Sequence, residues 1–132
     1  MGHIRKHLIS NEQGQTATEL AIVLPILCVL LFGVIQFGIL FNNYVTLTDA
    51  VRAGARKAAV SRQTSNPRGI CIDQVKASAG DLVQSKLQPD CQSTWAPASD
   101  VVVTAKYPYS ISLLGLVVAS GFLKSTTTER VE

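Results

Sequence analysis

The sequence predicts an α+β protein. A long N-terminal transmembrane helix extends out of the membrane and leads to a small domain with one short helix and a hairpin-like pair of strands. An apolar run of 22 residues, 20–41, is long enough to cross the hydrocarbon core as a helix. Apolar residues then continue at helical spacing as far as Ala59. The last 70 residues, 63–132, can bury only a small core.

Residues 1–14 are predicted to form a short cytoplasmic leader, which carries Arg5 and Lys6. A basic segment before an apolar run is also typical of a secretory signal. Such signals have an apolar core of about 7–15 residues, followed by a cleavage site of small residues. The run in this chain is longer and no such site follows it, so we expect the span to remain in the mature protein.

The long helix is expected over residues 15–62, with its transmembrane span at about 20–41. Gly33, Gln36 and Gly38 interrupt the aliphatic run of the span. Small residues let helix backbones approach closely, and a glutamine in lipid favours a hydrogen-bonding partner helix. These three residues therefore predict packing against another helix. The alternative is a plain anchor, because glycine is frequent in membrane spans generally.

Beyond the span, the helix carries a packing face and a polar stripe. Ala50, Gly54 and Ala58 form a row of small residues at every fourth position, which predicts close approach of a partner. Arg52 and Arg56 lie together on a polar stripe beside it. An isolated anchor has no need of a helix that protrudes so far with a packing face, so this segment favours assembly with other protein.

Turn residues and hydrophobic periodicity divide most of the remaining chain into a loop, an amphipathic helix, a second loop and two strands, at residues 61–69, 72–87, 88–99, 100–107 and 125–132. Pro108 is expected to end the first strand. Between the strands lies an apolar segment, 111–123, which is too short to cross a membrane comfortably. We expect it to form a loop or short helix that dips toward the membrane surface or packs on the long helix.

Two of the three cysteines lie in the polar domain, and the third lies in the span. Cys71 and Cys91 flank the predicted amphipathic helix, so they suggest a disulfide in an oxidising compartment. A zinc site is disfavoured because no histidine follows His7 to complete a ligand set. We expect no metal and no cofactor.

Charge and motifs argue against two broad classes of function. A formal net charge of +3, without clustered basic and aromatic residues, is too small to indicate nucleic-acid binding. The predicted outer domain has no histidine and no evident pair of catalytic carboxylates, and the chain has neither a G-x-S-x-G nor a P-loop motif. We therefore expect a protein that is not an enzyme.

A single acid, Glu19, lies five residues after Gly14 and immediately before the apolar run. A charge at mid-bilayer costs at least about 2.5–3.5 kcal/mol, so an acid beside a span suggests a function. This spacing resembles the prepilin-peptidase site of type IV pilin-like proteins. More specifically, the chain resembles the TadE-like family of the tight-adherence pilus system over most of its length, at residues 14–25, 37–38 and 50–60 and in the tail that closes with 130–132.

The resemblance implies a minor pilin or pseudopilin of the tight-adherence (Flp-type, type IVc) pilus, held in the bacterial inner membrane. Its partners would be a prepilin peptidase, other pilin-like subunits and the assembly platform. Cleavage would fall between Gly14 and Gln15, and Glu19 would pair with the new amino group of Gln15 on an adjacent subunit. One departure is Leu20, because many sites of this type have an aromatic residue after the glutamate.

Orientation and function each leave an alternative. The positive-inside rule, applied to four basic residues after the span, would place the C-terminal domain in the cytoplasm. The cysteine pair and the cytoplasmic action of the peptidase of the resembled family favour an extracytoplasmic domain with the N-terminus in the cytoplasm. The alternative function is a single-pass, membrane-anchored exported binding protein unrelated to pili, with Trp95, Tyr107 and Tyr109 as its contact residues.

Overall fold

The computed structural model describes residues 12–132, so most of the predicted leader lies outside the described part of the chain. Two α-helices, one 3-10 turn and three strands follow in order: α1 Glu12–Ala59, α2 Pro67–Ser78, η1 Gln84–Lys86, β1 Gln88–Gln92, β2 Asp100–Leu113 and β3 Leu116–Arg130. The strands form one antiparallel sheet in the order β1-β2-β3. The predicted α+β class is confirmed.

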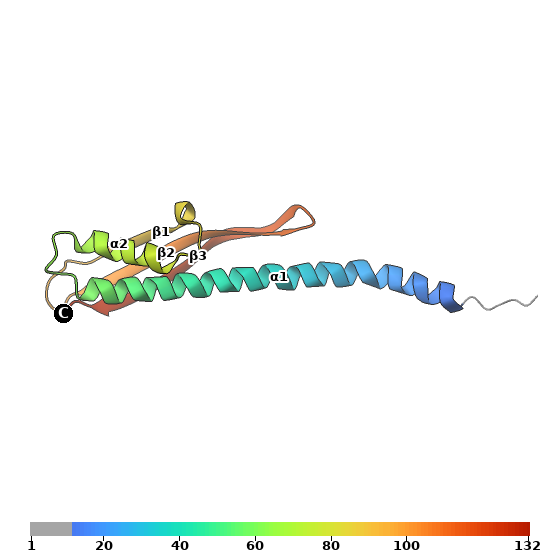
Figure 1. The fold of residues 1–132 in the computed structure, drawn as a ribbon, viewed down its shortest axis with the longest axis horizontal. Helices are drawn as coiled ribbons and strands as arrows, with labels where there is room; N and C mark the ends of the chain where they lie inside the picture. The colour runs from blue at the N-terminus through green and yellow to red at the C-terminus, as the bar shows by residue number, and fades with distance from the viewer. Residues whose placement is uncertain (1–11) are drawn as a thin grey trace, which may run out of the picture.

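The helix α1 runs along the whole molecule, and the rest of the fold lies beside its C-terminal half (Figure 1). Its 48 residues include Pro25 without a break. Arg56 and Lys57 lie in its last turn, where positive charge is favourable beside the helix carbonyls. The backbone N–H of Glu132 donates to the carbonyl of Ala59 at 3.0 Å and so satisfies one of the free carbonyls at the C-terminal end of α1.

The hydrophobic core lies between the sheet and the two helices. Alternate residues of β2 are buried, so only one face of the sheet is covered. The helix α1 contacts β2 and β3, whereas α2 packs against α1 and β1. The fully buried side chains come from every layer: Leu47, Val51, Cys71, Val75, Cys91, Val101, Val103 and Val131. The last turns of α1, from Leu47 to Ala59, therefore contribute to the same core as α2 and the sheet.

The short helix differs from the predicted one at both ends. It begins at Pro67, inside the predicted loop, because Asn66 and Pro67 form a helix start: the Asn66 Oδ1 accepts from the N–H of Gly69 at 2.9 Å. It ends at Ser78 rather than at residue 87, and Leu82 and Leu87 are buried from a turn and a 3-10 segment instead.

The sheet is larger than predicted. Residues 88–92, predicted as loop, form β1, which tolerates Pro89 because it is an edge strand. β2 continues through Pro108, since β1 begins only at Gln88, opposite Lys106, and leaves Pro108 without a ladder partner on that side. The apolar segment 111–123 is neither loop nor helix.

This apolar segment forms the far end of a long β2–β3 hairpin. A two-residue turn joins the strands at Leu114 and Gly115, with φ of 51° and 84°. Positive φ at both positions matches the twist of a tight hairpin. A shift in strand register between Ile111 and Ser112 marks a bulge just before the turn.

Candidate functional site

The N-terminal turns of α1 hold the predicted cleavage and charge-pairing residues. Gln15 and Glu19 lie one turn apart, and the Gln15 Nε2 donates to the Glu19 Oε1 at 3.3 Å. Thr18 donates to the carbonyl of Gly14 at 2.8 Å. The Gly14–Gln15 bond therefore lies in a helical first turn, where local opening costs least. Both Gln15 and Glu19 are exposed.

Glu19 has no cationic partner within residues 12–132. Its single hydrogen bond there comes from a neutral amide of its own helix. A carboxylate in this position at the edge of lipid is poorly compensated, because an ion or several donors are needed to offset its lost hydration. The described part of the chain thus leaves this carboxylate without a counter-ion.

The apolar half of α1 is mostly exposed, and its own fold covers only a few of its residues in part. The helix is long and apolar enough to cross a membrane, and 0% of its most apolar window is buried inside the protein. Its one cysteine, Cys28, is exposed with the rest of this surface. This single helix indicates a single-pass membrane protein.

The three predicted packing residues of the span lie in two different surroundings. A Cβ added to Gly33 or Gly38 would meet nothing within 4 Å. Both glycines line an open apolar groove of about 710 Å³ beside Leu113 at the end of β2. Gln36 instead lines a cavity of about 140 Å³ between α1 and β2, together with Asn43. The glutamine thus faces its own hairpin, while the glycines remain open.

The row Ala50, Gly54 and Ala58 is a helix-packing surface, but its partner is α2 of the same chain. All three residues are buried. A Cβ on Gly54 would overlap the Cγ2 of Val75 and lie 3.4 Å from the carbonyl oxygen of Cys71. The expected partner subunit is therefore replaced here by an intramolecular helix, and the close approach explains the glycine.

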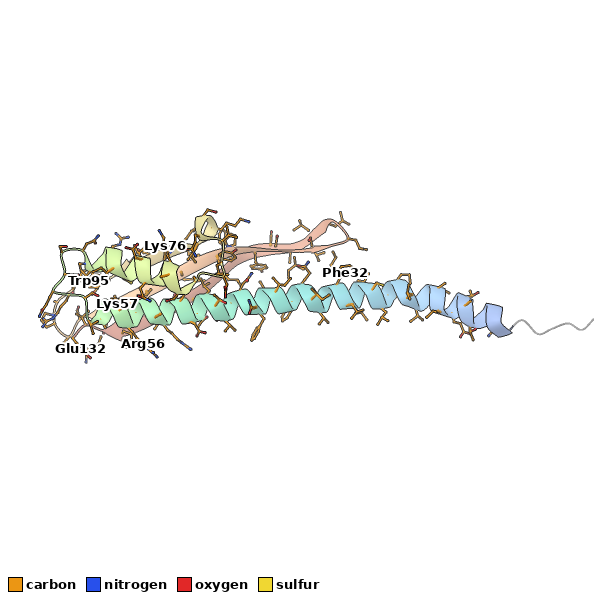
Figure 2. All side chains as sticks on the ribbon, in the orientation of Figure 1. Phe32, Arg56, Lys57, Lys76, Trp95 and Glu132 are labelled. Atoms are coloured by element: carbon orange, nitrogen blue, oxygen red, sulfur yellow. A yellow bond between two sulfur atoms is a disulfide. The ribbon has the colours of Figure 1, made fainter. Side chains whose placement is uncertain are left out.

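The polar stripe lies on the outer side of the same helix. Arg52 forms an ion pair with Asp49 at 3.8 Å, and both side chains are exposed. Arg56 is likewise exposed, near the C-terminal end of α1 (Figure 2). Such solvent-exposed pairs contribute little to stability, so these arginines are available to other molecules.

The structure contains the predicted disulfide between Cys71 and Cys91. It joins α2 to β1 and is buried in the core. Next to it, Asp90 accepts from Gln92 at 2.7 Å and from Arg68 at 2.8 Å. Both hydrogen bonds lower the pKa of the Asp90 carboxyl below its usual value, and the one from Gln92 has the larger effect.

The aromatic residues of the alternative function do not form one surface. Trp95 packs against the core. Tyr107 is buried, and its hydroxyl accepts from the N–H of Val83 at 3.3 Å. The Tyr109 ring lies over Gly121 on the neighbouring strand. Their roles in packing account for all three.

Sequence reasoning singled out the apolar segment 111–123 but missed that it forms the exposed end of a β-hairpin. Its exposed residues include Leu114, Leu116, Val117, Val118 and Phe122. The dipeptide Leu114-Gly115 between two apolar segments was the available sign of a hairpin turn. Among the described residues, no group of three or more His, Cys, Asp or Glu could hold a metal ion.

Residues 14–56 match the family model described as TadE-like protein. The matched segment is almost the whole of α1, from the predicted cleavage site to the buried row around Gly54. The suspected resemblance to the TadE-like family is thus confirmed over this helix, and it supports involvement in the Tad (Flp) pilus system. No curated protein and no solved structure matches the chain.

Proposed function

We propose that the protein is a non-enzymatic minor pilin or pseudopilin that takes part in assembly of, or secretion by, the tight-adherence pilus system. The observation that carries the proposal is the TadE-like match to α1, whose apolar half is mostly exposed and begins at an acid with no cationic partner among the described residues. A subunit of an assembly needs such a surface. An enzyme would need a reactive site, for which the described residues offer no evident candidate.

Charge pairing explains why an acid stands at the start of the span. After cleavage between Gly14 and Gln15, the mature chain begins with an ammonium group. The Glu19 carboxylate of one subunit pairs with the Gln15 ammonium of the next. Paired charges in an apolar surrounding are tolerated, whereas either charge alone carries a large desolvation cost. Correct neighbours are thereby distinguished from misplaced ones.

The proposal includes a location. The leader faces the cytoplasm, α1 spans the bacterial inner membrane once, and the domain with the disulfide lies on the extracytoplasmic side. A buried disulfide supports an oxidising compartment. The basic residues that count against this orientation, such as Arg52 and Arg56, lie on a helix that is part of the folded domain.

The N-terminus of the mature protein tests the proposal. We expect mass spectrometry of membrane-extracted protein to show a chain that begins at Gln15 in cells with an active prepilin peptidase. Cells without the peptidase, and the variant Gly14→Leu, should retain the leader. The matched control Gly33→Leu should be processed normally.

Pilus production separates the proposed function from the alternative. Deletion of the gene should abolish or reduce surface pili, and expression of the intact chain should restore them. An uncleaved Met1 terminus together with normal piliation in the deletion strain would favour an anchored binding protein unrelated to pili.

A further inference from the structure

The far end of the β2–β3 hairpin carries a cluster of apolar side chains that the fold leaves uncovered. Leu114 and Leu116 are 79% and 74% exposed, and Val117 and Val118 are also mostly exposed. Residues 107–123 include no charged side chain. A contiguous apolar surface of this kind is costly in water and marks a site of contact with protein or membrane. We name Leu113–Val118 the hairpin tip.

The position of the hairpin tip beside α1 indicates which of these it meets. The hairpin runs back along α1, away from the C-terminal end of that helix (Figure 1). Leu113 lines the same open groove as residues of α1 that all belong to the span: Val29, Leu30, Gly33, Val34, Phe37, Gly38 and Phe41. When α1 crosses a membrane, the hairpin tip is therefore at the depth of the acyl chains.

The polar boundary of the hairpin agrees with this depth. Lys106 and Lys124 are paired in register on β2 and β3, and both are exposed. Like charges directly opposite one another are unfavourable in an isolated sheet. Anionic headgroups would compensate them. Tyr109 and Phe122 lie between these lysines and the tip, as aromatic residues do at membrane interfaces.

The open edges of the hairpin limit how far it can enter. From Tyr107 to the hairpin turn, β2 is no longer paired with β1, and β3 is an edge strand along its whole length. Unpaired backbone groups are not tolerated deep in hydrocarbon. Pro108 removes one donor from these edges. Ser110 and Ser120 are paired in register behind the tip, which suits a level where water and headgroups still reach. Entry is thus restricted to the tip.

From these observations, we propose that the hairpin tip inserts into the membrane leaflet on the C-terminal side of the span, alongside α1. Lys106 and Lys124 then lie at the anionic headgroups. The protein contacts the bilayer at two places, and the second contact fixes the depth and rotation of α1. The proposal rests on α1 spanning a membrane and is independent of the pilus function.

Fluorescent probes in lipid vesicles test this insertion. The full chain with Cys28→Ser leaves no free thiol among residues 12–132, and the further change Leu116→Cys places one at the tip. An environment-sensitive fluorophore on that thiol is measured in vesicles of phosphatidylcholine and phosphatidylglycerol. We expect blue-shifted emission that is quenched by lipids with spin labels on their acyl chains.

The matched control is Thr128→Cys. Thr128 is exposed on the same strand, but the lysine pair separates it from the hairpin tip. Its probe should emit as in water and escape the acyl-chain quenchers. The same water-like emission at Leu116 would overturn the proposal.

Dilution in lipid distinguishes the bilayer from a protein partner. Quenching at Leu116 should be unchanged when the protein-to-lipid ratio is lowered. Blue-shifted emission without lipid quenching, or a blue shift that disappears on dilution, would show that another copy of the chain covers the tip. Either result would overturn the insertion proposal while leaving the proposed function intact.

Discussion

The two halves of α1 belong to one continuous helix but have opposite surroundings. From Leu20 to Phe41, most residues are large and apolar, and most are exposed. From Leu47 to Ala59, small residues predominate on the inner face, and that face is buried by α2 and the sheet. The first half is mostly exposed, with only Gly33, Gln36 and Leu40 partly covered by its own chain, whereas the inner face of the second half is buried.

Side-chain size explains the difference. Alanine and glycine let α2 approach the backbone of α1 closely, as at Gly54 against Val75. Bulky Leu, Ile and Phe residues instead present a wide apolar surface that suits acyl chains or other membrane helices. We therefore expect substitutions in the two halves of α1 to have different effects.

The largest effect is expected from Gly54→Leu. Its side chain would enter the contact between α1 and α2, so we expect a loss of about 3 kcal/mol or more of unfolding free energy. The protein has one tryptophan, Trp95, which packs against the core, so its fluorescence during denaturant unfolding in detergent reports on the domain.

Gly38→Leu is the matched control in the other half of α1. Nothing lies within 4 Å of a Cβ at this position, so the domain should unfold as in the wild type. Equal stability of the two leucine variants would show that the halves do not differ as described.

The next largest effect concerns the disulfide. Replacing Cys71 and Cys91 by alanine opens a loop with a sequence separation of 20 residues, for which the chain-entropy model gives about 3 kcal/mol. Membrane insertion should be unaffected, because the bond lies entirely in the domain half. Carbonate extraction measures insertion and denaturant unfolding measures stability. A domain whose midpoint does not change would contradict the role of the bond in holding α2 on the sheet.

The smallest effect is expected at Asp90. Contacts with Gln92 and Arg68 lower the folded-state pKa of its carboxyl below the ordinary value of 3.8. The stabilisation is therefore complete above about pH 4 and is lost as the pH falls through the lower folded pKa. Because solvent screens this pair, Asp90→Asn should cost only about 0.5 kcal/mol at pH 7. The difference between the unfolding curves of the two proteins should be present at pH 7 and should shrink as the pH is lowered below 4.

The sequence was sufficient for the elements with strong, uninterrupted patterns. The apolar run and the helical spacing beyond it predicted α1, and two cysteines in a small domain predicted the disulfide. The predicted cleavage and charge-pairing residues, Gly14 and Glu19, lie in the first turns of this helix, and their role stays a prediction. The family match covers this same segment.

The rest depended on tertiary context. A proline such as Pro108 ends a strand only where its missing N–H would have to bond a neighbouring strand. The sequence does not show that the pairing of β1 with β2 reaches no further than Lys106. The bulge near Ile111 breaks the alternation that would identify a strand. The row around Gly54 requires a close neighbour, but its pattern is the same for an internal helix and for another subunit. Sequence alone therefore suggested the right surface and the wrong partner.

The substitution Glu19→Gln tests the central claim most directly, with Glu129→Gln on exposed β3 as the control. Removing the charge should make insertion of the span no harder, so membrane abundance and the unfolding of the domain should match the wild type. We predict that sheared surface pili, measured beside membrane abundance, are lost in Glu19→Gln and retained in Glu129→Gln. Normal piliation with Glu19→Gln would contradict the account, because the uncovered half of α1 would then be only an anchor.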